Sequence, residues 1–289
     1  MNFAFLKYLL DALGVGPFLF IRFLTMPLLA FLLLALVFRR RIARTWPKRE
    51  DLPLFIACGL VGHALHVGLV FHGIHLSTAF SSALVLTSGP LFTLLILAVL
   101  GTERLRATQV AGTLVALIGI ALFLSEKFGG GIAHAGLGDL VLLVAASLFS
   151  LYTVMVRPLV HRYGPLIVLA YTLLFGAPPM VLLSAPSMFS ANLGALTLTV
   201  WIGLFWAIVL SSVGGWLVWT WVNAVRGIAR SAPLMYLPPP IAGVVAWLTL
   251  GEQFTWLKIA GAAVTMAGIA WAQFGAGAPP REAAQPDSG

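Results

Sequence analysis

Long apolar runs separated by short polar segments make up the chain from residue 2 to residue 274. A helix needs about 20 apolar residues to cross a bilayer core of about 30 Å. Nine runs are long enough, namely 17–38, 52–72, 77–100, 107–125, 138–157, 164–185, 198–222, 231–250 and 256–274. A tenth run, 2–13, would extend only about 18 Å as a helix. The pattern therefore predicts an all-α, polytopic membrane protein.

Composition agrees with this prediction. The chain is 60% hydrophobic and 9% charged, with a mean hydropathy of +1.01, whereas soluble domains are about 25% charged. Its single cysteine, Cys58, excludes an intrachain disulfide. The net charge of +8 does not by itself indicate a nucleic-acid partner, and we expect none. We expect no cleavable signal peptide.

The basic residues predict an orientation. If the loop at 39–49 is cytoplasmic and the spans alternate, 13 of the 17 Lys and Arg residues lie on the cytoplasmic side. Only Lys127 and Lys258 then lie in outer loops. This asymmetry follows the positive-inside rule. We therefore expect a multi-pass protein of a bacterial-type inner membrane, with both termini in the cytoplasm.

The chain contains an internal duplication. Four residues recur 149 positions later: Pro90, Glu103, Gly112 and Gly119 correspond to Pro239, Glu252, Gly261 and Gly268. Each half then holds five spans. Because five is odd, the second half must enter the membrane in the opposite orientation. Such inverted repeats are typical of transporters whose substrate site lies near the membrane midplane.

The duplication predicts how the chain is divided. We expect a first repeat at 1–125, an external linker at 126–137, a second repeat at 138–274 and a disordered cytoplasmic tail at 275–289. Upstream, Gly16-Pro17 matches Gly164-Pro165 at an offset of 148. At an offset of 150, Asn2 corresponds to Tyr152, which is already well inside its span. The first helix is therefore expected to be incomplete, through either an upstream start or the loss of half a helix.

These motifs resemble those of a known family. The pattern Pro-x12-Glu followed by spaced glycines, found in both halves, and the opening "NFAFLK" resemble the EamA-type drug/metabolite transporters. The resemblance covers about residues 2–274, although "LGTE" in the first half is one residue longer than "LGE" in the second. It implies ten helices in two inverted sets of five and the export of small metabolites, amino acids among them. We expect no cofactor.

Two cations, Lys7 and Arg22, fall inside predicted spans. A charge within the membrane is costly, so it is by default a candidate functional group. Each side chain could contact an anionic substrate or form part of a gate. Alternatively, each could extend to the outer headgroups and serve structure only.

Four histidines occur in "GHALHVGLVFHGIH". At 100° per residue, His63 and His66 share one side of a helix, while His72 and His75 lie on the other. One metal ion cannot bind all four, and we expect no metal site. His66 is a candidate for a proton-linked group, with a hydrogen-bonded packing role as the alternative.

Prolines predict helix breaks in the spans at 77–100 and 231–250. Broken helices are tolerated in membranes only where protein or a cavity covers them, so we place these breaks at a central cavity, with packing kinks as the alternative. We expect Glu103 and Glu252 to be structural residues that close hairpins and favour a helix N-terminus. The residues expected to line the pathway are Asn2, Lys7, Arg22, His66, Ser81, Ser88, Pro90, Tyr152, Trp216, Tyr236 and Pro239.

Catalytic motifs are missing from the sequence. It contains no HExxH, GxSxG or GxxxxGK[ST], and all nine carboxylates lie at span ends, in loops or in the tail. We therefore expect a secondary or facilitative carrier rather than an enzyme, with an intramembrane enzyme or a channel-like pore as alternatives. Coupling to protons and plain uniport both stay open. A monomer is expected, because the two repeats already supply both halves of a carrier.

Overall fold

The computed structural model describes residues 3–38, 46–101, 106–129, 133–215, 218 and 238–274. Across these ranges the chain is helical and contains no strand. The predicted all-α fold is therefore confirmed. The predicted count of ten spans is not established, because 216–217 and 219–237, which include parts of two predicted spans, lie outside the described residues.

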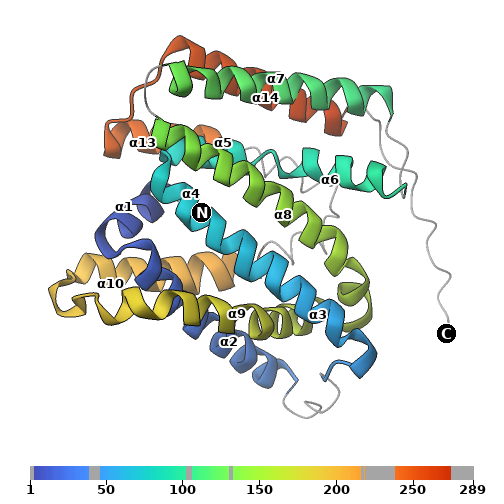
Figure 1. Cartoon of the computed structure of the whole chain (residues 1–289), viewed down its shortest axis with the longest axis vertical. Helices are drawn as coiled ribbons and strands as arrows, with labels where there is room; N and C mark the ends of the chain where they lie inside the picture. Colours follow the sequence, from blue (N-terminus) through green and yellow to red (C-terminus); the bar gives the residue numbers. More distant parts are fainter. Residues whose placement is uncertain are drawn as a thin grey trace.

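Twelve labelled α-helices make up most of the described fold (Figure 1). They are α1 (Phe3–Leu13), α2 (Val15–Val37), α3 (Leu52–Cys58), α4 (His66–Leu76), α5 (Ala79–Leu86), α6 (Gly89–Val99), α7 (Ala107–Gly129), α8 (Ala133–Tyr163), α9 (Pro165–Phe189), α10 (Leu198–Phe205), α13 (Pro238–Leu250) and α14 (Trp256–Phe274). Two π-helical segments, η3 (Gly59–Leu65) and η5 (Trp206–Gly214), and two short 3-10 turns, η2 (Arg49–Asp51) and η4 (Leu193–Ala195), complete the set.

Length and composition identify the helical stretches that suit a membrane. Six are long and apolar enough to cross it: Val15–Val37, Arg49–Leu76, Ala79–Val99, Ala107–Ser125, Gly136–Tyr163 and Pro165–Phe189. Shorter apolar helices follow at Leu198–Gly214, Pro238–Leu250 and Trp256–Ala272. The stretch from α3 through η3 to α4 is continuous, whereas the predicted span at 77–100 is broken into α5 and α6.

The surface of the long helices is apolar on both faces. On α2, Leu28 and Leu36 are more than 60% exposed, while Phe23 and Leu34 on the opposite side are at most 2% exposed. In water, the outer face would be polar. A helix that is apolar all round instead fits a bundle surrounded by lipid.

Helices that the duplication makes equivalent lie side by side and run in opposite directions. In Figure 1, α7 and α14 form a pair at one edge of the bundle. Gly112 lies against Ala272, and Ala116 lies against Gly268. Residue numbers rise along one helix as they fall along the other, so the pair is antiparallel, as an inverted repeat requires.

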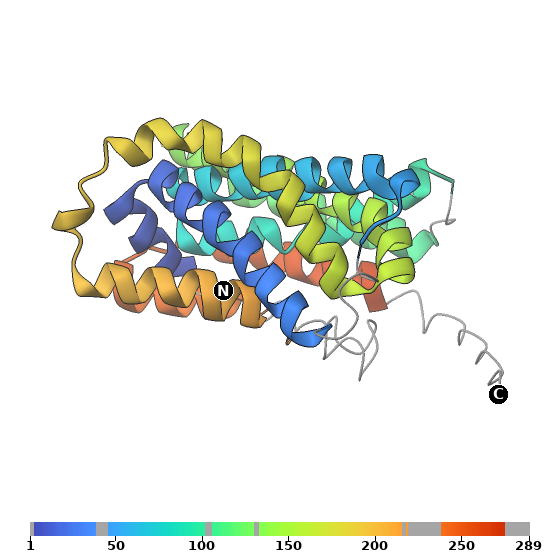
Figure 2. The same ribbon diagram turned by 90° about the horizontal axis from the view of Figure 1, so that it is seen from below.

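A second equivalent pair, α2 and α9, shows the same arrangement (Figures 1 and 2). Gly16 lies against Ser187. Nearer the C-terminal end of α2 and the N-terminal end of α9, the ring centres of Phe31 and Tyr171 are 5.4 Å apart. These contacts again pair rising with falling residue numbers. The two pairs therefore bring the repeats together through helices of opposite direction.

Backbone geometry corrects the upstream alignment of the repeats. Gly14 (φ 85) precedes α2 and Gly164 (φ 79) precedes α9, and both have a positive φ that favours glycine. The equivalent of Gly164 is therefore Gly14, at an offset of 150. The predicted match with Gly16 at 148 was wrong because it followed a Gly-Pro dipeptide rather than the backbone conformation.

Candidate functional site

Two polar contacts cross between the repeats deep in the helices. Arg22 Nη1, on α2, lies 2.6 Å from Ser212 Oγ, in η5. His63 Nε2, in η3, lies 3.0 Å from Thr172 Oγ1, on α9. Arg22 and Thr172 are 150 residues apart, and His63 and Ser212 are 149 apart. Each contact is therefore the pseudosymmetric counterpart of the other.

Both contacts depend on π-helical segments at equivalent places in the two repeats. A π-turn adds a residue to the helical turn, and such segments are frequent at functional sites. Ser212 Oγ donates to the carbonyl of Ala207, five residues earlier, at 2.7 Å. That bond uses the hydroxyl proton, so Ser212 accepts the hydrogen bond from Arg22.

Arg22 is half-buried and its charge is not neutralised within the described part of the chain. Its guanidinium carbon lies 5.1 Å from the centre of the Phe71 ring on α4, a cation–π contact. Among the ion pairs of the described residues, none involves Arg22. A hydroxyl and an aromatic face are thus the contacts described for a positive charge inside a span.

Hydrogen-bond partners fix the roles of the two histidines. Thr172 Oγ1 donates to Val168 O at 2.7 Å, so it accepts from the Nε2–H of His63. His66 Nδ1 lies 2.8 Å from Ala145 O on α8 and must donate, because a carbonyl only accepts. A neutral His66 therefore keeps its other nitrogen, Nε2, as an acceptor.

Tyr152 on α8 forms the wall next to these histidines. Its ring centre is 5.6 Å from that of His63, and Phe149 lies 5.0 Å from His66. A Cβ on Gly62 would come within 2.2 Å of the Tyr152 ring. A glycine in η3 thus allows the aromatic ring to pack directly on the backbone.

Three of the predicted pathway residues lie at these contacts. Arg22 forms one of them, and His66 and Tyr152 lie beside the other. His63, Thr172 and Ser212 also belong to this group, and sequence reasoning did not place them in the pathway. One sequence feature could have identified them. His63 and Ser212 are polar residues inside apolar spans, and they occupy equivalent positions in the two repeats.

Lys7 lies elsewhere. Its ammonium group donates to the carbonyl of His75 in the last turn of α4 and lies 3.5 Å from Asp11. Asp11 in turn lies 3.1 Å from His75 Nδ1. A cation at a helix C-terminus is favoured by the helix dipole. These contacts support the structural alternative for Lys7.

The break between α5 and α6 is covered by protein. It falls at Thr87 and Ser88, so Pro90 lies in the first turn of α6 rather than at an internal kink. Ser88 is buried, and its hydroxyl donates to Val85 O at 2.5 Å. Ser150 on α8 donates to Gly89 O at 2.7 Å. Pro239 occupies the corresponding place near the start of α13 and is buried.

Glu252 joins the repeats at the start of α5. Its carboxylate accepts a hydrogen bond from Ala79 N at 2.7 Å. We predicted that this residue would support a helix N-terminus. The helix it contacts is α5 in the other repeat, however, and not the following helix, α14. Because α13 packs against α5, the residues that follow α13, including Glu252, lie beside the start of α5.

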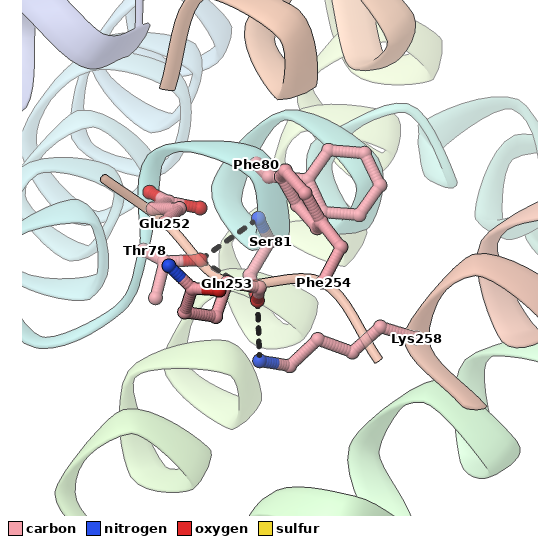
Figure 3. A pocket seen from close by; sticks show the side chains of 7 residues that line it. All are labelled: Thr78, Phe80, Ser81, Glu252, Gln253, Phe254 and Lys258. Carbon is pink, nitrogen blue, oxygen red and sulfur yellow. Dashed lines mark hydrogen bonds between the residues drawn. The ribbon is translucent and has the colours of Figure 1, made fainter. Parts of the chain in front are cut away.

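A pocket of about 150 Å³ opens at this junction (Figure 3). Phe80 and Phe254 form its apolar wall, with ring centres 5.0 Å apart. Its lining consists of Thr78, Phe80, Ser81, Glu252, Gln253, Phe254 and Lys258. Of the predicted pathway residues, Ser81 lies here. The pocket therefore lies at the start of α5 and in the segment before α14, whereas a central cavity was expected at the helix breaks of the spans 77–100 and 231–250.

Four other predicted residues lie outside the described part of the chain. They are the pathway candidates Asn2, Trp216 and Tyr236 and the hairpin residue Glu103. Among the residues described, no group of three or more His, Cys, Asp or Glu side chains could hold a metal ion.

Comparisons with known proteins fit this architecture. The chain is 30% identical over 226 residues, 77% of its length and 73% of the relative's, to a probable terminal-alkyne amino-acid exporter of Streptantibioticus cattleyicolor. It is 24% identical over 196 residues, 65% of each chain, to a probable amino-acid metabolite efflux pump of Salmonella typhimurium.

Two further comparisons cover most of the chain. The uncharacterized transporter YdfC of Bacillus subtilis is 27% identical over 83% of this chain and 76% of its own. One solved crystal structure superposes with a TM-score of 0.60 over 94% of this chain and 93% of its own, at 21% identity, and so shares the fold. The sequence profile of the EamA-like transporter family matches residues 1–125 and 136–273. The chain therefore belongs to the EamA-like transporter family and has its two-repeat membrane transporter fold.

Proposed function

We propose that this membrane exporter is a secondary or facilitative carrier that moves a small amino acid or amphipathic metabolite by alternating access. The main support is the pair of pseudosymmetric contacts, Arg22–Ser212 and His63–Thr172, each of which links a long helix of one repeat to the π-helical segment of the other. Two halves joined in this way can rock about a site between them. Two relatives are named as amino-acid or amino-acid metabolite exporters, which favours that substrate class.

The proposal includes an arrangement in the membrane. The repeats occupy 1–125 and 138–274, joined by an external segment, and both termini face the cytoplasm of a bacterial-type inner membrane. The chain acts as a monomer and carries no catalytic role. Its pathway passes Arg22, His66 and Tyr152, because these polar groups lie inside spans beside the contacts that join the repeats.

Counterflow tests the carrier mechanism. Purified protein in liposomes loaded with unlabelled L-leucine or L-phenylalanine should accumulate the same labelled amino acid from outside. A carrier exchanges solute across the membrane, so internal substrate accelerates entry, whereas a channel-like pore shows no such stimulation. Protein-free liposomes are the control. Equal entry with and without internal solute would reject alternating access, and no entry of either amino acid would reject this substrate class.

The coupling proposal is that His66 carries a proton during uphill transport. Its Nδ1–H is held by Ala145 O, which leaves Nε2 to bind and release a proton. The His66→Gln variant should lose uphill transport driven by a pH gradient while retaining counterflow. His72→Gln is the matched control, because the hydrogen bond described for His72 Nδ1 stays within its own helix, to Gly68 O at 2.8 Å. Unchanged uphill transport by His66→Gln would reject proton coupling through this residue.

A further inference from the structure

The guanidinium of Arg22 has more donors than its described partners use. Arginine presents five N–H groups in a fixed planar fork. One is bonded to Ser212 Oγ, and the guanidinium carbon lies 5.1 Å from the centre of the Phe71 ring. Within the described part of the chain, Arg22 forms no ion pair. An uncompensated charge in a span marks a place where an anion would be stabilised.

The second repeat provides an internal control for this position. Its equivalent of Arg22 is Thr172, a neutral residue whose hydroxyl contacts His63. The same cross-repeat contact is therefore made without a charge, and helix pairing alone does not require one. The two halves also pack similarly here, because α2 pairs with α9 and each contacts the π-segment of the other repeat. The charge in the first repeat needs a different explanation.

We propose that Arg22 binds the carboxylate of the transported solute and that Ser212 occupies its fork when no solute is bound. This inference rests on the proposed amino-acid transport and names the chemical group recognised. Arginine suits the role because its fork matches a carboxylate bidentately, whereas lysine acts as a point charge. The Phe71 ring stabilises the guanidinium charge by a cation–π contact. The site therefore lies on one side of the pseudo-twofold axis, in the half that carries Arg22.

Thermal stabilisation of the full detergent-purified chain tests this inference. The probes are L-leucine and L-phenylalanine, compared with their decarboxylated amines, 3-methylbutylamine and 2-phenylethylamine. The amino acids should stabilise the wild-type protein and the amines should not. In Arg22→Gln the half-saturating amino-acid concentration should rise at least about tenfold, with Arg22→Lys intermediate.

Two further variants separate binding from a structural role. Ser212→Ala removes the resident partner of Arg22, so the half-saturating concentration should fall or stay unchanged; a purely structural contact would give weaker stabilisation instead. Thr25→Val should behave as wild type. This residue lies one turn along α2, and among the described residues its hydroxyl bonds to Ile21 O of its own helix. Arg22→Lys preserves the charge if Arg22→Gln fails to fold.

The outcomes distinguish this inference from the proposed function. Equal stabilisation by amino acids and amines, no stabilisation by either, or an unchanged response in both Arg22 variants would overturn the carboxylate site. Counterflow that proceeds under any of these results would leave the carrier proposal standing. Amino-acid-specific stabilisation that is lost in Arg22→Gln, without counterflow in the wild type, would keep the binding site and reject the carrier.

Discussion

Alanine at Gly112 and Gly268 together is expected to separate α7 from α14 and to lower the stability of the protein severely. A Cβ on Gly112 would lie 2.3 Å from Ala272 N, and one on Gly268 would lie 2.3 Å from Ala116 N. The obstructing atoms are backbone, so no side-chain rotation relieves the clash. Membrane helices gain little from the hydrophobic effect against each other and depend on such close approach.

Overpacking typically lowers the free energy of unfolding by about 1–3 kcal/mol at each site. Because both clashes here involve backbone atoms of one interface, each substitution should reach the upper part of that range. Thermal unfolding of the purified variant, followed by size-exclusion chromatography, measures the effect. Gly215→Ala is the control, because a Cβ there has no atom of the described residues within 4 Å. A double variant as stable as Gly215→Ala would show that α7 and α14 do not pack through these glycines.

Cysteines placed at Arg106 and Thr255 are expected to react from opposite sides of the membrane. The two residues are 149 positions apart, both are exposed, and each immediately precedes a helix of the antiparallel pair α7 and α14. Under the predicted orientation, Arg106 is cytoplasmic and Thr255 is external. In a Cys58→Ser background, an impermeant maleimide should label Thr255→Cys in intact cells and Arg106→Cys only after permeabilisation.

This experiment separates the inversion from the orientation. Labelling of both variants from the same side would contradict the inverted repeat. Labelling from opposite sides, but in the reverse sense, would keep the inversion and overturn the placement of both termini in the cytoplasm. The Cys58→Ser protein without an added cysteine is the control for background labelling. Cys58 itself is buried.

Much of the fold was predictable because its determinants are local. A helix in lipid satisfies its own backbone hydrogen bonds, so apolar length alone predicts it. The recurrence of Pro90, Glu103 and Gly112 at a constant offset also identified α7 and α14 as equivalent before their contact was known. The alignment failed near Gly16, because backbone conformation at Gly14 and not sequence similarity marks the start of α2.

The partners of functional side chains were less predictable. Sequence reasoning selected Arg22 because a charge inside a span is costly, His66 as a candidate proton-linked group, and Tyr152 as the repeat counterpart of Asn2. It could not show that Arg22 meets Ser212, 190 residues away, or that Glu252 meets the start of α5. Those contacts depend on how each helix is rotated and on the two π-segments, whose extra residue shifts the faces that a regular 3.6-residue period predicts.

The sequence by itself therefore determined that this chain is helical, membrane-embedded and duplicated. The length of an apolar run and the spacing of recurring residues can both be read along the chain, without knowledge of tertiary contacts. Only the tertiary structure decided which polar groups meet across the repeats. A contact between distant helices is set by packing in three dimensions, and small rotations change it without changing the apolar pattern.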